Sequence, residues 1–121
     1  MKHRPPAPDR PAVPQAVQDC HDLLVWLVPV LDGFPRARRF GLGDRLESAM
    51  IDVLEALLEA AYTRNKQDSL RRANLRLEIS RHLWRLCFEL KVVALKRYEQ
   101  GARLMDGLGR QVGGWLRSAP A

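Results

Sequence analysis

Apolar residues recur along most of the chain at the three- and four-residue spacing of amphipathic helices. The first such run covers residues 16–33 and contains Cys20, Leu23, Leu24, Leu27, Val30 and Leu31. Pro29 lies inside this run and removes one backbone donor, so a kink is expected near the end of the helix. Gly33, a residue type that favours helix C-termini, marks the predicted end.

A second run gives the clearest amphipathic stripe. Its apolar positions are Leu42, Leu46, Ala49, Met50, Val53, Leu54, Leu57, Leu58 and Ala61. Gly41 stands where a helix N-cap belongs, and Asp44 occupies the acidic position of a capping box three residues later. The segment RNKQDS then interrupts the pattern, so the second predicted helix covers residues 42–61.

A third helix is predicted over residues 68–90, and it has two apolar faces. The face directed to the core contains Leu70, Ala73, Leu77, Ser80, Trp84 and Cys87. At about 100° per residue, a second group gathers on another face and comprises Leu75, Ile79, Leu83, Leu86 and Leu90. A monomer would leave this second face in water, so Leu75, Ile79, Leu83 and Leu86 are predicted to form an oligomer interface.

The fourth predicted helix begins at Leu95 and ends near Leu116. Each glycine costs up to about 1 kcal/mol in a helix interior, which favours close helix approach as the reason for several of them. These glycines are Gly101, Gly107, Gly109, Gly113 and Gly114. No segment alternates with period two over a useful length, so no strand is predicted. Four helices with short connections indicate an all-α fold, an antiparallel up-down four-helix bundle.

Composition divides the chain into one domain with two short ends. Residues 15–118 are predicted to form the bundle, residues 1–14 with five prolines a flexible arm, and residues 119–121 a tail. Cys20 and Cys87 lack the spacing of a zinc or disulfide framework and are expected to be reduced. The longest apolar run, residues 23–31, is far shorter than the ~20 residues that a membrane span requires. A cytoplasmic protein without membrane contact is therefore expected.

No catalytic or metal-binding constellation is found in the sequence. His82 and Cys87 are five residues apart, about 140° around a helix, and cannot form a dyad by themselves. The paired Glu and Glu-x-x-His motifs of di-iron bundles are absent, and FGLGDR lacks the pattern of a P-loop. We therefore predict no catalytic residue, metal or cofactor. A small enzyme or metal-binding bundle is the weakest functional alternative.

The net charge of +6 favours a polyanionic partner, and the charges are unevenly spread. Residues 46–63 hold four acidic residues and no Lys or Arg, whereas residues 64–85 hold seven basic and two acidic residues. The basic positions expected to lack local partners are Arg64, Lys66, Arg71, Arg72 and Arg76.

A second set of basic residues, Arg36, Arg38 and Arg39, precedes the second predicted helix. Only Asp32 and Asp44 lie nearby, and Asp44 is assigned to the cap, so the three arginines cannot all be paired locally. In an antiparallel bundle the two basic sets lie at opposite ends, about 30 Å apart. Both sets are predicted to contact nucleic acid or a protein partner, with little preference for nucleotide sequence.

Three stretches of the chain resemble one known family. LVPVLDGFPRARRFGLGDRLESAMIDVLEALLEA is similar to the signature of the four-helix-bundle family that includes the accessory variability determinant (Avd) of diversity-generating retroelements. The same family includes proteins encoded in intervening sequences of 23S ribosomal RNA genes. RRANLRLEISRHLWRLCFELK resembles its third helix, and LGRQVGGWLRS the end of its fourth. The likeness covers residues 17–118 and departs from the pattern at Gly41, where a hydroxyl cap such as Thr is expected.

The resemblance implies more than the composition does. Avd proteins assemble as five-fold rings with a positively charged surface, and they bind the reverse transcriptase and template RNA of the retroelement. They are required for error-prone cDNA synthesis and have no known catalysis of their own. The chain is thus expected to be a non-catalytic accessory protein and a homo-oligomer, a pentamer, with reverse transcriptase, template RNA and cDNA as partners. The alternative is a stand-alone RNA-binding protein associated with 23S rRNA intervening sequences.

Overall fold

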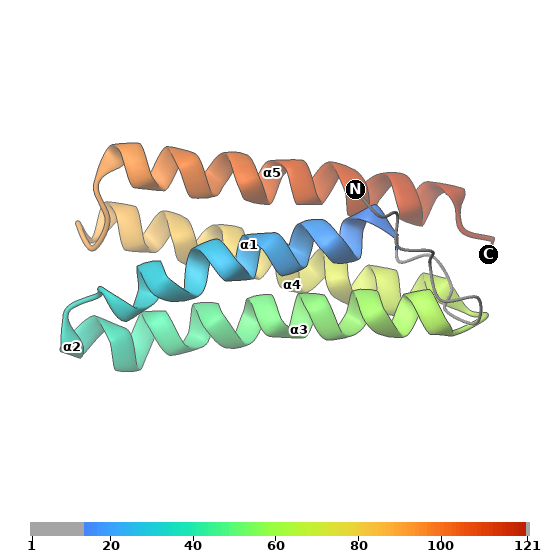
Figure 1. The fold of residues 1–121 in the computed structure, drawn as a ribbon, viewed down its shortest axis with the longest axis horizontal. Coiled ribbons are helices and arrows are strands. Elements are labelled where there is room, and N and C mark those ends of the chain that lie inside the picture. The colour runs from blue at the N-terminus through green and yellow to red at the C-terminus, as the bar shows by residue number, and fades with distance from the viewer. Residues whose placement is uncertain (1–13, 121) are drawn as a thin grey trace, which may run out of the picture.

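The computed structural model describes residues 14–120, so residues 1–13 of the predicted arm and Ala121 of the predicted tail lie outside the described part. Its elements are α1 (Gln15–Asp32), α2 (Arg36–Arg38), the π-helical segment η1 (Arg39–Gly43), α3 (Asp44–Tyr62), α4 (Lys66–Glu89) and α5 (Leu95–Ser118). The four long helices run antiparallel to their chain neighbours (Figure 1), and residues 14–120 contain no strand. The predicted all-α four-helix bundle is confirmed.

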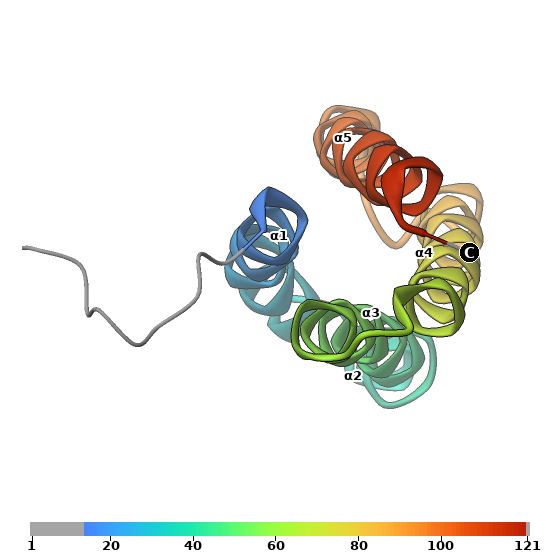
Figure 2. The same cartoon turned by 90° about the vertical axis from the view of Figure 1, so that its right-hand side faces the viewer.

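The long helices follow one another around the bundle in chain order. Seen from the end in Figure 2, α1, α3, α4 and α5 form a ring of four in which the α1–α5 side is the most open. The connection through α2 and η1 lies at the same end as the α4–α5 turn, while the α3–α4 connection lies at the other end (Figure 1). One end of the bundle therefore carries α2, η1 and the α4–α5 turn, and the other end carries the α3–α4 connection.

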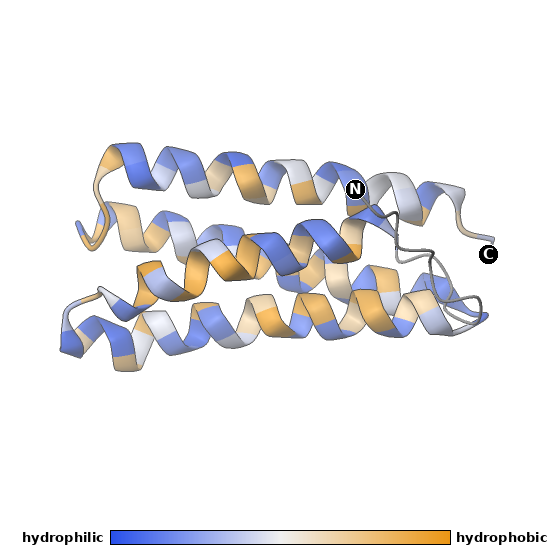
Figure 3. Cartoon of the chain, viewed as in Figure 1, coloured by the Kyte–Doolittle hydropathy of each residue, from blue (hydrophilic) through white to orange (hydrophobic). Residues whose placement is uncertain are grey.

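The core is built from the apolar stripes that the spacing predicts. Hydrophobic positions recur between hydrophilic ones along each long helix (Figure 3). Trp84 of α4 is the largest fully buried side chain, and its Nε1–H donates a hydrogen bond of 2.9 Å to the carbonyl oxygen of Tyr98. The ring of Trp26 meets that of Trp84 edge-on at 5.9 Å, so α1, α4 and α5 share one aromatic cluster.

Close helix approach explains only one of the five glycines of α5 clearly. A Cβ at Gly101 would lie 2.6 Å from the indole of Trp84. At Gly109 the nearest atom would be 3.7 Å away, an ordinary contact, and at Gly107 and Gly114 the only neighbours are the flexible ends of arginines on the same helix. The expectation of close helix approach is therefore wrong for Gly107, Gly113 and Gly114, because the only atoms near their Cβ positions belong to arginine side chains of α5 itself.

The segment before α3 is helical, and the prediction that Gly41 caps a helix is wrong. The backbone N–H groups of Arg38 and Arg39 both donate to the carbonyl of Pro35 at 2.8 Å, so helical structure begins at Arg36, before Gly41 is reached. It continues through η1 into α3 without a side-chain cap. Gly43, rather than Gly41, is the tightly packed glycine of this segment, because a Cβ there would lie 3.3 Å from Cδ and Nη1 of Arg39 whereas none of the described atoms lies within 4 Å of a Cβ at Gly41.

Candidate nucleic-acid interface

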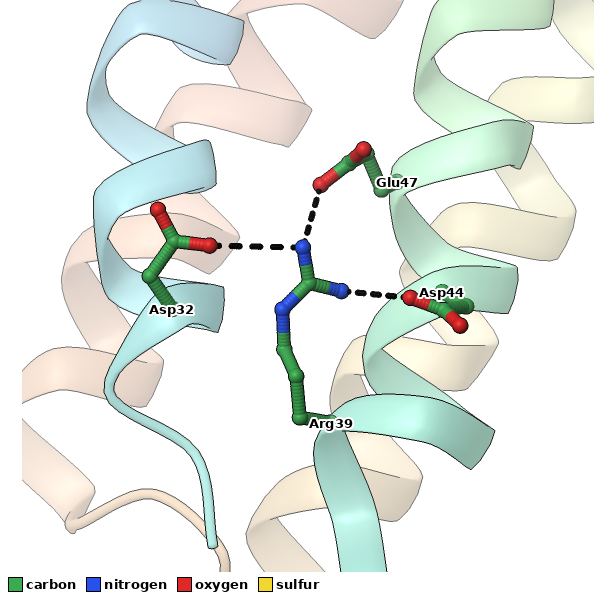
Figure 4. Close-up of polar contacts among 4 residues, drawn as sticks. All are labelled: Asp32, Arg39, Asp44 and Glu47. Atoms are coloured by element: carbon green, nitrogen blue, oxygen red, sulfur yellow. Dashed lines mark hydrogen bonds and ion pairs between the residues drawn. The ribbon is translucent and has the colours of Figure 1, made fainter. Parts of the chain in front are cut away.

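Arg39 is the centre of a four-residue ion cluster that joins α1 to α3. Its guanidinium contacts Asp32 Oδ1 at 3.3 Å, Asp44 Oδ1 at 2.7 Å and Glu47 Oε1 at 2.9 Å (Figure 4). The Arg39 side chain is only 20% exposed. The prediction that the three arginines cannot all be paired locally holds for the described residues, and Arg39 is the one that is paired, because the π-helical turn carries it between the end of α1 and the first turn of α3. The prediction that Asp44 serves as a cap is wrong.

The other two arginines of this segment make no ion pair within residues 14–120. The guanidinium of Arg36 lies over the ring of Phe40, 5.7 Å from its centroid. Burial raises the pKa of Cys87 on α4 to about 11, and the positive charge of the nearby Arg38 partly opposes this rise. Phe40 itself is 68% exposed. Arg36 and Arg38 thus remain available to an anion, whereas Arg39 does not.

The second predicted basic set is largely matched by acidic residues of α3. Arg72 pairs with Glu59 at 2.6 Å, and Arg76 approaches Asp52 at 4.0 Å. The acidic segment 46–63 and the basic segment 64–85 lie side by side as α3 and α4, so much of the charge is offset between the helices. The expectation that Arg72 and Arg76 are unmatched is wrong for this reason.

The remaining residues of the second basic set are Arg64, Lys66 and Arg71, and each makes different contacts. Lys66 donates from Nζ to the carbonyls of Ala60 at 2.7 Å and Thr63 at 2.9 Å, and so satisfies the C-terminal end of α3. Arg71 approaches Asp68 at 3.9 Å on its own helix. Arg64 is exposed and makes no ion pair within the described residues. As predicted, this set lies at the opposite end of the bundle from Arg36 and Arg38 (Figure 1).

A basic stripe on α5 was missed by the sequence reasoning. It consists of Lys96, Arg103, Arg110 and Arg117, which are spaced exactly one heptad apart. All four are exposed, and none makes an ion pair among residues 14–120. Seven residues return a helix to within about 20° of the same direction and advance it by about 10 Å, so the stripe is about 30 Å long. The repeated spacing of seven is the signal that could have found it.

The basic stripe borders a groove between α1 and α5. Two hollows of about 550 and 390 Å³ share Asp19 and Gly107 in their walls and so form one continuous groove. Arg103 and Arg110 line it from α5, and Asp19 and Asp22 line it from α1. The two walls carry opposite charge, and the basic wall continues outward onto the exposed face of α5.

The predicted oligomer face of α4 is exposed to differing degrees. Leu75 is 59% exposed, Ile79 and Leu86 are half-buried, and Leu83 packs partly against the core. Leu90, further along the same face, is 47% exposed. An apolar strip therefore does lie on the outside of α4 in the monomer, and its role in an oligomer stays a prediction.

A metal site and a membrane-spanning helix are the two other features to consider in the described part of the chain. Residues 14–120 hold no group of three His, Cys, Asp or Glu side chains placed to bind a metal ion. No helix within that range is long and apolar enough to cross a membrane. Both cysteines are buried and unpaired with each other, and burial raises the pKa of Cys20 to about 12.

Comparison with known protein families gives a match over the whole described bundle. The model of the bAvd-like family matches residues 15–119, which run from the first residue of α1 to the residue after α5. No curated protein matches the chain. Since the family match spans all four long helices, including the Arg39 cluster and the basic stripe, the chain belongs to the bAvd-like family and is an Avd-like accessory protein.

Proposed function

We propose that this protein is the non-catalytic accessory subunit of a diversity-generating retroelement, and that it binds template RNA and the reverse transcriptase during mutagenic cDNA synthesis. Membership of the bAvd-like family supports the general role. The observation that supports nucleic-acid binding is the basic stripe, Lys96, Arg103, Arg110 and Arg117, whose four side chains are exposed and form no ion pair within the described residues.

The geometry of the basic stripe suits a linear polyanion. Its four cations are spread over about 30 Å of one helix face, so a nucleic-acid backbone can contact several of them at once. Each phosphate contact releases counterions, and binding then weakens with salt at a slope of about 0.7 per contact for a single strand. Phosphate contacts carry no base information, so little sequence preference follows.

Self-association would strengthen such binding. Leu75 and Leu90 expose apolar surface on α4, and burial of that surface between subunits at about 25 cal/mol per Å² favours a homo-oligomer. The family resemblance favours a ring of five. A ring presents the basic stripe once per subunit, and linked sites bind a long RNA with an avidity that one site cannot reach.

A charge-matched pair of variants tests the RNA-binding part of the proposal. Arg103→Gln with Arg110→Gln removes two cations of the stripe, and Arg81→Gln with Arg85→Gln removes two cations of α4 that already pair with Glu78, Asp106 and Glu89. RNA titrations at two salt concentrations should show weaker binding and a salt slope lower by about 1.4 for the stripe variant only. Equal losses, or no loss in the stripe variant, would contradict the proposal.

The stand-alone RNA-binding alternative uses the same basic stripe but needs no polymerase. Co-purification with a reverse transcriptase encoded beside this gene, together with paired template and variable repeats, supports the retroelement role. RNA binding without any such neighbour supports the association with 23S rRNA intervening sequences. Genomic context and one pull-down experiment therefore distinguish the retroelement role from the stand-alone RNA-binding role.

A further inference from the structure

The short helical turn between α1 and α3 carries an exposed aromatic ring and two exposed cations, one of which lies over the ring. We define the tip as Arg36, Arg38 and Phe40. Phe40 is 68% exposed, and between residues 33 and 45 it is the only large hydrophobic side chain that is exposed. Arg36 and Arg38 make no ion pair within the described chain, and Arg36 lies beside the Phe40 ring. An exposed ring beside the unpaired guanidinium of Arg36 offers adjacent apolar and cationic surface to a partner that has both apolar and anionic groups.

The tip is also firmly held in place. Arg39, in the middle of it, is bound to carboxylates from α1 and α3. The backbone on either side is helical, with the N–H groups of Arg38 and Arg39 bonded to Pro35. Phe40 therefore projects from a fixed support and loses little conformational freedom when a ligand covers it.

We propose that the tip binds single-stranded nucleic acid, with one unpaired base stacked on Phe40 and the flanking phosphates on Arg36 and Arg38. The proposal rests on nucleic-acid binding as the proposed function and adds a preference for unpaired strands. Aromatic side chains beside cations are the usual means of holding single strands, since every base has a stacking face. A duplex keeps its bases stacked on one another and cannot offer one to the ring.

A nucleic acid fits the tip better than a protein surface does. A specific protein interface usually buries about 800 Å² on each side around an apolar centre. Phe40 stands alone in that respect, because Leu42 and Phe34 on either side of it are half-buried or buried. The cation–π contact of Arg36 is weak at an exposed site, so an incoming base can take its place while Arg36 turns to a phosphate.

The test compares Phe40→Leu with Phe40→Tyr on three probes: oligouridine, an abasic oligomer of the same length, and a fully paired RNA duplex. Phe40→Leu should lose about five-fold or more in affinity for oligouridine, and Phe40→Tyr should retain it. Binding of the abasic oligomer and of the duplex should be the same in all three proteins. Tyr62→Leu removes an equally exposed aromatic ring, 64% accessible at the other end of the bundle, and should change nothing.

Each other outcome has a distinct meaning. Unchanged oligouridine binding by Phe40→Leu, or an equal loss on the duplex, overturns the stacking proposal while the proposed function stands on the Arg103 and Arg110 variants. Loss of reverse-transcriptase capture by Phe40→Leu with RNA binding intact would make the tip a protein contact and also overturns it. A wild-type protein that binds none of the three probes would instead remove the proposed RNA-binding function itself.

Discussion

Gly101 of α5 faces the indole of Trp84 so closely that a methyl group at this glycine would lie 2.6 Å from both Cε2 and Nε1. Since Trp84 is 1% exposed and its Nε1–H is bonded to the carbonyl of Tyr98, the ring cannot move aside without breaking that bond. The contact sets the distance between α4 and α5.

Gly101→Ala should therefore lower the free energy of unfolding by about 1–3 kcal/mol, in spite of the better helix propensity of alanine. Gly107→Ala is the matched control on the same helix, because only Nη2 of Arg110 lies near its Cβ position, at 3.8 Å. The control should gain up to about 1 kcal/mol. Urea denaturation of both variants decides the point, and two changes of the same sign would refute the close-contact argument.

Arg39 should be the one arginine of its segment that matters for folding. Arg39→Gln leaves Asp32, Asp44 and Glu47 facing one another without the guanidinium. We expect the free energy of unfolding to fall, because three carboxylates lose the charge-assisted hydrogen-bond donor that they share. Arg38→Gln should change it by less than about 0.5 kcal/mol. Similar effects of the two substitutions in urea melts would show that the cluster contributes little.

Lys91 ends α4 with a φ of 63°, the single positive φ of a non-glycine residue in the described chain. Side chains are disfavoured in this left-handed region, and glycine is the usual residue at this position after a helix. Lys91→Gly should therefore raise the free energy of unfolding by about 1 kcal/mol. Lys91→Ala keeps a Cβ and should give no comparable gain in the same thermal or urea melt.

Stability should fall at alkaline pH through the two buried thiols. Burial raises the pKa of Cys20 from 9.0 to about 12, and that of Cys87 to about 11. The folded state then holds these protons in a pH range where the unfolded state has released them, so the free energy of unfolding falls as pH rises from 9 toward 11 or 12. Below pH 9 the contribution is complete.

The measurement is a series of urea melts between neutral and alkaline pH on the wild type and on Cys20→Ala with Cys87→Ala. The double variant should be less stable at neutral pH but should lose stability less steeply above pH 9. Titration of lysines and tyrosines is common to both proteins and cancels in the comparison. If both proteins lost stability equally steeply above pH 9, burial would not raise the pKa of the two thiols in solution.

Charge placed on the outer face of α4 should disrupt self-association. Leu75→Asp puts a carboxylate at a position that is 59% exposed in the monomer, so the fold itself should be unaffected. Val25→Asp on α1, 63% exposed, is the control. Light scattering should give an oligomer for the wild type and the control, and a smaller species for Leu75→Asp. A monomeric wild type at micromolar concentration would remove the oligomer prediction.

The helices could be predicted from the sequence because each depends on a local spacing of apolar residues. The ion pairs could not, because they depend on which helices become neighbours. Arg72 looks unmatched on its own helix and finds Glu59 only when α3 packs beside α4. The same holds for Arg39, whose partner Glu47 is eight residues away and comes within reach through a π-helical turn.

Two features of the candidate interface can be read from the sequence alone. The heptad spacing of Lys96, Arg103, Arg110 and Arg117 is visible without a structure. The exposed position of Phe40 follows from its place off the apolar stripe that continues into α3. Gly41, in contrast, resembles a cap because its neighbours fit a capping box, and only the hydrogen bonds that the Pro35 carbonyl accepts from Arg38 and Arg39 show that the helix has already begun.

The two ends of the described chain, Pro14 and Pro120, leave the bundle at the same end, which is the end opposite to the tip (Figure 1). An affinity tag or a surface linker attached at either terminus would hold the protein by the end remote from Phe40. Because both ends lie at one end of the bundle, circular permutation can join them by a peptide that crosses that end from α5 to α1, with new ends opened at the α3–α4 connection. Such a permutant would keep all four helices while moving both free ends away from α1 and α5.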